Sequence, residues 1–349
     1  MKVYSDEKRK IFIHVEFNSL RAFQFYYEIN IEVIIMNVGV ASGKGGTGKT
    51  TVAVNLALSL NLDLDLGLRF LDCDVEEPNS NLFFGYELDR LKTVEKKIPN
   101  INYDKCNFCK KCMEYCEFNA LAVVPDEVMV FDDLCHSCGL CSMVCPEEAI
   151  KEKGTRIGEI KTNQIQKKPK KTNEIDKSNE KTKNSDKSIP ASDNEIEFYE
   201  GEMDVGRVMS SPVISELKKQ IDNSKLNILD IPPGSGCPVI EAMDNLDYLI
   251  LVTEPTKFGL SDLKNSVKLA EAMKIPHGVI INKSQEDAQE THKYCSKKDI
   301  PIHLEIPNQR EIAELYSDGV PFITQMPQWK KKFRDTYSEI KEKIEIEVN

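Results

Sequence analysis

The sequence is 349 residues long and has no apolar segment that could span a membrane. A membrane helix needs about 20 consecutive apolar residues, whereas residues 1–35 alternate charged side chains with Phe, Tyr and Ile. That alternation also lacks the apolar centre of a secretory signal peptide. We therefore expect neither a membrane span nor a leader, and we expect the protein to work in the cytoplasm.

An excess of basic residues is absent as well. The chain holds 46 Lys and Arg against 57 Asp and Glu, a formal net charge of −11. Proteins that bind nucleic acids or anionic membranes use clustered basic side chains to neutralise phosphates. The charge balance therefore argues against a general nucleic-acid or membrane-surface binder.

Large apolar side chains almost disappear after Ile160. Residues 161–195 consist mainly of Lys, Asn, Ser and Asp. Such a segment buries too little surface to offset the entropy lost on ordering. We predict a disordered linker over residues 161–199; the alternative is a basic tract that contacts an acidic partner.

What the chain does contain is an alternation of short apolar strands and helix-patterned segments. Strands are predicted at 38–41, 69–71, 226–229, 248–252, 278–281 and 301–305, and helices at 50–60, 212–221, 260–273, 286–298 and 310–317. This alternation predicts an α/β fold with a doubly wound, mostly parallel sheet. The alternation stops between the second and third strands, where an insertion rich in cysteine occupies the gap.

A phosphate-binding loop follows the first predicted strand. The residues Gly43-Lys44-Gly45-Gly46-Thr47-Gly48-Lys49-Thr50 match G-x-x-x-x-G-K-[ST] between a strand and a helix. The glycines allow backbone N–H groups to surround phosphates, and the helix N-terminus adds positive potential. We expect Lys49 to bind the β- and γ-phosphates of ATP, Thr50 to bind Mg²⁺, and Thr51 to complete the nucleotide-binding set.

Three aspartates lie at the ends of predicted strands. Asp72 and Asp74 follow the second strand, and Asp230 ends the third, just before a Pro-Gly turn. Ligand-binding groups of open α/β sheets gather at such carboxyl ends, although strand-end aspartates also serve as helix caps. Next to a phosphate loop, Asp230 is expected close to Mg²⁺.

Eight of the eleven cysteines form two runs with the spacing C-x2-C-x2-C-x3-C. This is the bacterial ferredoxin pattern, in which the fourth cysteine of each run serves the other [4Fe–4S] cluster. The predicted ligands are Cys106, Cys109, Cys112 and Cys145 for cluster 1, and Cys135, Cys138, Cys141 and Cys116 for cluster 2. Zinc is the alternative, because thiolates bind it too.

Two details of the cysteines stay open. Pro146 follows Cys145 as the ferredoxin pattern expects, but Glu117 follows Cys116. Outside the runs, Cys73 and Cys295 are isolated, and Cys237 lies beyond Asp230. We interpret Cys237 as a structural or reactive thiol.

The form GKGGTGKT resembles the variant phosphate loop of the MinD/ParA/Mrp branch of P-loop ATPases. The segments LDCDVEEPN, DIPPGSGCPVI, VTEPTKFGLSDLK and IPNQREIAELYSDG are also similar to family segments. From Met36 to Phe322 the chain therefore resembles members of this superfamily that carry an inserted two-cluster ferredoxin domain.

The resemblance implies roles for four residues. Lys44 would reach the nucleotide of a partner subunit, so that ATP is held between two subunits, although a solvated loop lysine is the alternative. Asp74 would orient or activate the attacking water, and Asp72 would support Mg²⁺ through its water shell. Asn282 would contact adenine; an Asn after a strand is otherwise a common turn residue. For Cys237, the relationship of this branch to the nitrogenase iron protein implies the alternative of a cluster shared between subunits.

These observations divide the chain into four parts. Residues 1–35 are either an added strand and helix or, as we favour, a dispensable extension before Met36. An ATPase domain is expected at 36–98 and 200–349, an inserted α+β ferredoxin-like domain at 99–160, and the linker at 161–199. The C-terminal segment places Trp329, Phe333, Ile340 and Ile344 near one helix face and mixes Lys with Glu, which suits docking on the sheet better than lipid.

Three functions fit these features. The first is an ATPase whose nucleotide-dependent homodimer, or heterodimer with a related ATPase, is coupled to electron transfer through two [4Fe–4S] clusters to an unidentified redox or cofactor-assembly protein. The second is an iron–sulfur carrier or assembly ATPase of the Mrp kind. Such carriers use a separate surface C-x-x-C, which this sequence lacks outside the two runs. The third is a MinD/ParA-like positioning ATPase with structural clusters.

Overall fold

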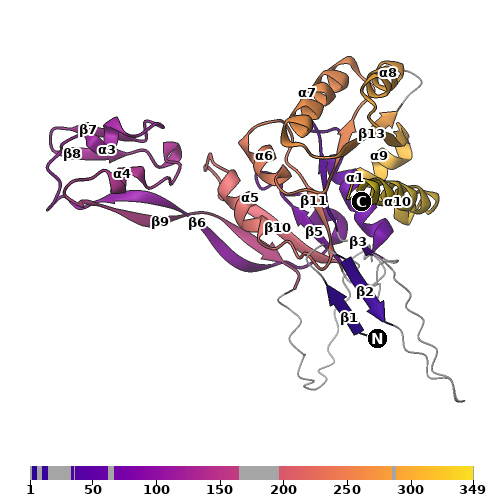
Figure 1. Ribbon diagram of the computed structural model, residues 1–349, viewed down its shortest axis with the longest axis horizontal. Helices are drawn as coiled ribbons and strands as arrows, with labels where there is room; N and C mark the ends of the chain where they lie inside the picture. Colours follow the sequence, from indigo (N-terminus) through magenta and orange to yellow (C-terminus); the bar gives the residue numbers. More distant parts are fainter. Residues whose placement is uncertain are drawn as a thin grey trace, which may run out of the picture.

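The structure is a computed structural model that describes residues 2–5, 10–14, 33–34, 36–61, 67–164, 196–284 and 288–348 (Figure 1). Most of the expected extension at 1–35 and most of the expected linker lie outside the described residues. The described strands of the first part are β1 (Lys2–Ser5), β2 (Lys10–His14) and β3 (Val33–Ile34), which form a separate three-stranded sheet.

A nine-stranded sheet forms the body of the protein, in the order β14-β13-β12-β4-β11-β5-β10-β9-β6. Its parallel strands are β4 (Asn37–Ala41), β5 (Leu68–Asp72), β10 (Glu197–Met203), β11 (Leu226–Asp230), β12 (Tyr248–Thr253), β13 (His277–Ser284) and β14 (Ile302–Pro307). The six predicted strands and the mostly parallel sheet are confirmed. The strands β4, β11 and β12 are buried along their whole length, as expected for parallel strands covered on both faces.

Helices cover both faces of this sheet. One face carries α1 (Lys49–Leu60), α2 (Asn81–Phe84), α9 (Arg310–Ser317), η2 (Phe322–Thr324) and α10 (Gln328–Val348). The other carries α5 (Ser211–Lys218), α6 (Cys237–Met243), α7 (Lys257–Met273) and α8 (Gln289–Lys298). Docking of the C-terminal segment is confirmed, since Trp329, Phe333 and Ile340 are buried in the first core. None of the described helices is long and apolar enough to cross a membrane.

Two long strands leave the edge of the sheet as a ribbon. They are β6 (Asp89–Ile101) and β9 (Ile150–Thr162), which pair antiparallel along their length. The pairing of β9 with β10 joins the ribbon to the body. None of these three strands was predicted, because β6 and β9 are rich in Lys and Glu and have no apolar run.

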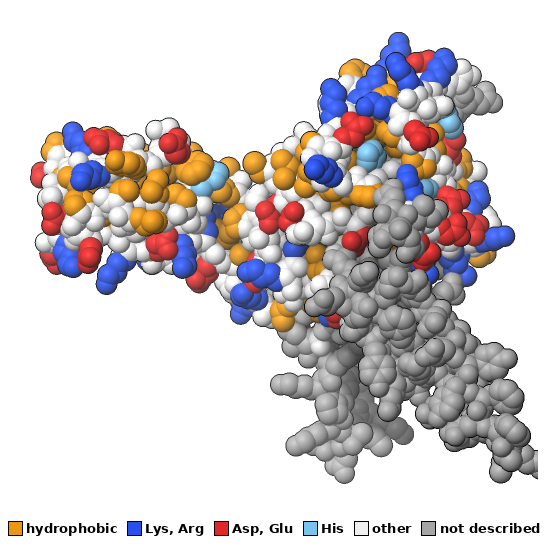
Figure 2. Space-filling model, in the orientation of Figure 1, with side chains coloured by type: hydrophobic (Ala, Val, Ile, Leu, Met, Phe, Trp, Pro, Cys, Tyr) orange, Lys and Arg blue, Asp and Glu red, His pale blue; other side chains and the backbone are white. Residues whose placement is uncertain are grey.

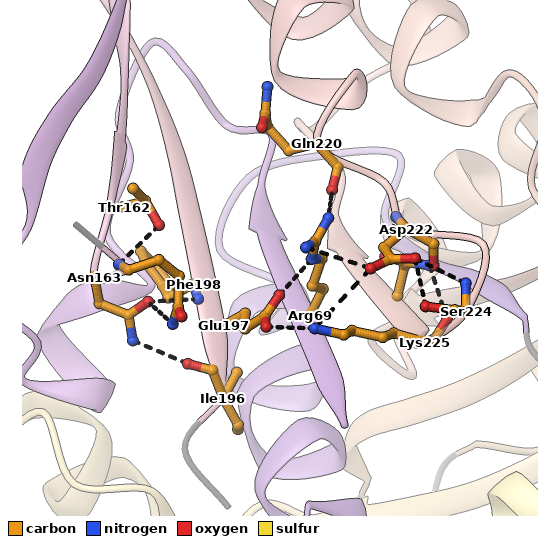
Figure 3. A network of polar contacts seen from close by, with 12 residues as sticks. Arg69, Thr162, Asn163, Ile196, Glu197, Phe198, Gln220, Asp222, Ser224 and Lys225 are labelled. Carbon is orange, nitrogen blue, oxygen red and sulfur yellow. Dashed lines mark hydrogen bonds and ion pairs between the residues drawn. The ribbon is translucent and has the colours of Figure 1, made fainter. Parts of the chain in front are cut away.

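The expected linker at 161–199 is therefore wrong at both ends. Lys161 and Thr162 finish β9, and Glu197 to Tyr199 begin β10. Polar contacts fix this junction, as Figure 3 shows: the Asn163 amide donates to the Ile196 carbonyl at 2.9 Å and accepts from the Phe198 N–H at 3.0 Å. An ion pair between Arg69 of β5 and Glu197, 2.6 Å long, ties β10 to its other neighbour. Such pairing satisfies backbone groups that a polar sequence alone does not reveal.

The ribbon carries a small head formed by residues 102–149. Its elements are α3 (Lys111–Glu114), β7 (Leu121–Val124), β8 (Glu127–Val130), η1 (Asp132–Leu134) and α4 (Leu140–Met143). In Figure 1 the head stands away from the sheet at the end of the ribbon. All eight cysteines of the two runs lie in it.

Candidate functional site

The phosphate loop lies between β4 and α1, at the carboxyl end of a central strand. Gly48 has a φ of 91°, a left-handed conformation that favours glycine. A Cβ at this position would lie 2.1 Å from the Asn282 amide nitrogen. The loop is thus built closely against β13, and a side chain at Gly48 would displace it.

Lys49 of this loop faces three carboxyl groups. Its Nζ lies 2.7 Å from Asp74 Oδ2 and 3.7 Å from Asp230 Oδ1. Burial by itself would lower the pKa of Lys49, but Asp230, Asp74 and Asp72 outweigh it and raise that pKa. One ammonium against three carboxyl groups leaves a surplus of negative charge, which a divalent cation would offset.

Thr50 and Asp230, the two residues that the sequence analysis places closest to Mg²⁺, are in direct contact. The Thr50 hydroxyl donates to Asp230 Oδ2 at 2.6 Å, and both residues are buried. The second carboxylate oxygen of Asp230 and the Thr47 hydroxyl are buried with no hydrogen-bond partner among the described residues. Because buried polar atoms are normally paired, these two atoms fit a site for Mg²⁺ and phosphate.

Asp72 organises the loop that follows β5. It accepts hydrogen bonds from the backbone N–H groups of Asp74, Asn79 and Ser80 at 2.9–3.2 Å. Burial raises the pKa of Asp72 to about 7, and nearby Asp230 adds to this rise. Ser80, which the sequence reasoning missed, donates to Asp230 at 3.3 Å and links the two acids.

Lys44 forms an ion pair that sequence reasoning also missed. Its Nζ lies 2.9 Å from Glu254 Oε2, and Lys283 binds the other oxygen of Glu254 at 2.7 Å. Glu254 directly follows β12. The strand-end rule applied to Asp230 would have identified it. The side-chain amide of Asn282 donates to the Thr47 carbonyl at 2.7 Å and so holds the phosphate loop against β13.

Two cavities in the head collect the cysteines in two sets of four. One cavity is lined by Cys106, Cys109, Cys112 and Cys145, the other by Cys116, Cys135, Cys138 and Cys141. These are the same two sets that the crossed ferredoxin pattern predicts. Cluster binding at them stays a prediction.

The backbone of the head repeats with the cysteines. Each cysteine of the second run lies 29 residues after its counterpart, and so do three pairs of left-handed residues: Phe108 and Ser137, Lys110 and Gly139, Asn119 and Glu148. The N–H groups of Ala120 and Ala149, again 29 apart, donate to the sulfurs of Cys116 and Cys145 at 3.3 Å. Hydrogen bonds to sulfur favour thiolate ligands. The cavities are therefore equivalent halves of one repeated unit.

The chemistry of the thiols fits a bound metal centre. Burial first, and then the neighbouring thiols, raises the pKa of Cys112 and of Cys141. Four thiolates around one cavity thus need a cationic core to stabilise them.

The other cysteines lie in the body. Cys73 and Cys295 are buried, and burial raises the pKa of each thiol, to about 11 for Cys295. Cys237 is exposed at the first residue of α6. Cys73 and Cys295 are therefore packing residues, whereas the thiol of Cys237 is accessible to solvent.

Known proteins resemble this chain over much of its length. The family model described as CobQ/CobB/MinD/ParA nucleotide binding domain matches residues 38–322. The uncharacterised protein MJ0579 of Methanocaldococcus jannaschii is 30% identical over 257 residues, 72% of this chain and 79% of that protein. An iron-sulfur cluster carrier protein of Rickettsia felis is 32% identical over 104 residues, 29% of this chain and 33% of the carrier.

Among solved structures, the septum site-determining protein MinD of Pyrococcus horikoshii, complexed with Mg-ADP, is similar at 19% identity and a TM-score of 0.47. The likeness covers 88% of this chain and 96% of that one. The family model spans the phosphate loop, the three aspartates and the head. The chain belongs to the CobQ/CobB/MinD/ParA nucleotide-binding domain family.

Proposed function

We propose that this protein binds and hydrolyses ATP in a dimer and couples that cycle to electron transfer through two [4Fe–4S] clusters in its head. The observation that carries the proposal is the pair of four-thiol cavities on a ribbon that belongs to the nucleotide-binding sheet. The clusters would supply one-electron redox chemistry. The ribbon continues through β9 and β10 to β5, which ends at Asp72.

The nucleotide site has the groups that ATP hydrolysis needs. Lys49 would bind the β- and γ-phosphates, while Thr50 and Asp230, with Asp72 behind them, would hold hydrated Mg²⁺. Arrival of phosphate would draw Lys49 away from Asp74, to which it is now bound at 2.7 Å. Asp74 would then be free to accept a hydrogen bond from the attacking water.

Lys44 is proposed to act across the dimer. In the single chain it is paired with Glu254 and its side chain is 36% exposed. An exposed ion pair stabilises by only about 0–1 kcal/mol, so nucleotide phosphates in a facing subunit could compete for this lysine. Lys44 would add a second positive charge to that of Lys49 and so offset the negative charge that develops on the transferred phosphoryl group.

A redox partner is expected at the head. Eight large apolar side chains there are at least 39% exposed: Tyr103, Tyr115, Phe118, Val124, Met129, Phe131, Leu134 and Met143. Figure 2 shows much hydrophobic surface on this part of the molecule. Contiguous exposed apolar surface is typical of protein-binding sites.

The coupling is tested on anaerobically purified protein. We expect about eight iron atoms per chain and a reduction potential that changes when Mg-ATP is added. Iron at this level without any nucleotide effect on potential, partner binding or electron-transfer rate would refute the coupling. Lys44→Ala should reduce ATP turnover and self-association. Unchanged values for both would refute the dimer.

A carrier function is the second candidate, favoured by the similarity to the Rickettsia felis iron-sulfur cluster carrier protein. Under this alternative the loaded protein would transfer its clusters to an apo-ferredoxin, and its own iron would fall in step. Under the electron-transfer proposal the iron stays bound while the acceptor is reduced. Measuring the iron content of the protein and the absorption spectrum of the acceptor in the same experiment distinguishes cluster transfer from electron transfer.

A further inference from the structure

A buried lysine lies in the ribbon below the head. Lys96 of β6 is 5% exposed, whereas its neighbours Glu95 and Lys97 are exposed. Its Nζ donates to the Asp132 carbonyl at 2.5 Å and to the Cys135 carbonyl at 3.4 Å. It also lies 4.0 Å from the sulfur of Met209.

These contacts satisfy the ammonium protons but leave its charge without a counter-ion. No ion pair of Lys96 occurs in the part of the chain that the structure describes. A buried, unpaired ammonium is costly, and two carbonyls and a thioether are neutral. A negatively charged group bound in the head would supply this counter-charge.

The carbonyls of Asp132 and Cys135 lie at the start of the second cysteine run, and Cys135 lines the cavity that also holds Cys116, Cys138 and Cys141. Four thiolates around an iron–sulfur core carry net negative charge, which grows when the core is reduced. We propose that Lys96 is the buried counter-charge of this cluster, cluster 2, and holds its reduction potential above that of cluster 1. The inference rests on the cluster binding of the proposed function, and it does not depend on ATP.

Cluster 1 has no counterpart of Lys96, because every other lysine of the described head and ribbon is exposed or half-buried. Lys110 and Lys111 line the cavity of cluster 1, but both are exposed. At the other cavity the exposed Lys97 is offset by Glu152 at 3.8 Å. Charges in water are screened, while a buried charge acts through a medium of lower dielectric constant. Burial therefore makes Lys96 the charge that distinguishes two otherwise repeated sites.

The contact between Lys96 and Met209 places cluster 2 nearer the body than cluster 1. Met209 lies in the loop between β10 and α5. Ribbon residues Lys97 and Pro99 line the cavity of cluster 2, whereas Ile101, at the end of β6, lines that of cluster 1. An electron shared between the clusters would then rest beside the ATPase body.

The test is an anaerobic redox titration of the full chain, without nucleotide, followed by electron paramagnetic resonance. Lys96→Met and Lys96→Gln remove the charge; Gln keeps a donor for the carbonyls. We expect one cluster to lose at least tenfold in its equilibrium constant for reduction, a fall of about 59 mV for one electron. The other cluster should not move. Lys96→Arg should keep the wild-type potentials.

Lys97→Met is the matched control, because it removes an equal charge one residue away that is exposed to solvent. Its shift should be less than half that of Lys96→Gln. In a Cys109→Ala background, which removes a proposed ligand of cluster 1, the shifted step should persist. Unchanged potentials in Lys96→Gln, equal shifts of both clusters, or an equal shift in Lys97→Met would overturn the proposal.

The outcomes separate this proposal from the proposed function. Wild-type protein without iron after reconstitution would overturn both. Wild-type potentials that ignore Mg-ATP would overturn the coupling but leave the effect of Lys96 intact. Loss of one cluster from both neutral variants, with retention in Lys96→Arg, would support the counter-charge through cluster stability, whereas loss from all three would overturn it.

Discussion

At the scale of single residues, the nucleotide site concentrates more carboxyl groups than its one lysine can neutralise. Asp72 and Asp230 are fully buried, and Lys49 contacts Asp74 and Asp230 directly. Before nucleotide and Mg²⁺ bind, this arrangement costs stability that binding can recover. We therefore expect the surplus of carboxyl groups to favour binding of a nucleotide together with Mg²⁺.

Asp72 should make the nucleotide-free protein less stable as the pH rises. Its pKa is raised from 3.8 to about 7 in the folded state. The folded state then binds the proton more tightly, so the contribution is fully present below about pH 4 and is lost as the pH rises to about 7. Denaturant unfolding at several pH values should show this fall, and Asp72→Asn should flatten it. An equal slope in the variant would contradict the assignment.

At the scale of elements, the loop between β10 and α5 connects the nucleotide site with the ribbon. The buried Ser210 donates to Glu76 Oε1 at 2.9 Å, and the Met203 N–H donates to the Val75 carbonyl at 2.8 Å. Both acceptors follow Asp74 in the chain. Met209, next to Ser210, contacts Lys96. The segment after Asp74 is thus connected to the head through the side chains of Ser210, Met209 and Lys96. A movement of that segment could reach the head by this route.

Ser210→Ala should weaken the effect of nucleotide on the clusters. The side chain of Ser210 makes no capping bond to α5, so the substitution removes mainly its bond to Glu76. We expect the Mg-ATP-dependent change in potential to fall at least twofold, with the nucleotide-free potentials unchanged. Stability should drop by about 1 kcal/mol. Ser211→Ala is the matched control, and a full nucleotide effect in Ser210→Ala would exclude this route.

At the scale of the whole molecule, the head and the nucleotide site use different residues. The groups around Lys49 come from α1, β5, β11 and the loops beside them, while the described head continues from the ribbon at Ile101 and Ile150 and contacts Lys96 of β6. Ile101 and Ile150 are directly paired at the base of the head. The head is therefore removable without cutting a strand of the body.

Replacement of residues 102–149 by Asn-Gly should leave nucleotide binding intact. This dipeptide forms the two-residue turn that suits a hairpin, and Lys96 becomes solvated when its cover is removed. We expect ADP affinity within about twofold of wild type, measured by calorimetry, and complete loss of iron. A tenfold loss of ADP affinity in a folded variant would show that the head supports the nucleotide site.

Local spacing made much of this protein predictable. The phosphate loop, the cysteine runs and the buried parallel strands depend on neighbours within a few residues, so their sequence signals are complete. The charged strands β6 and β9 gave no such signal. They become strands because each satisfies the backbone of the other and because β10 accepts β9 at the sheet edge.

The sequence by itself determined the family, the parallel sheet and the grouping of eight cysteines into two sets. Each of these depends on residues that are close together in the chain. Only the tertiary structure decided which charges meet. Lys44 pairs with Glu254, 210 positions away, and Lys96 rather than Lys97 is buried against Asp132. Adjacent lysines are chemically equal in the sequence. The strand alternation and the loop packed against one face make one a solvated charge and the other a buried one.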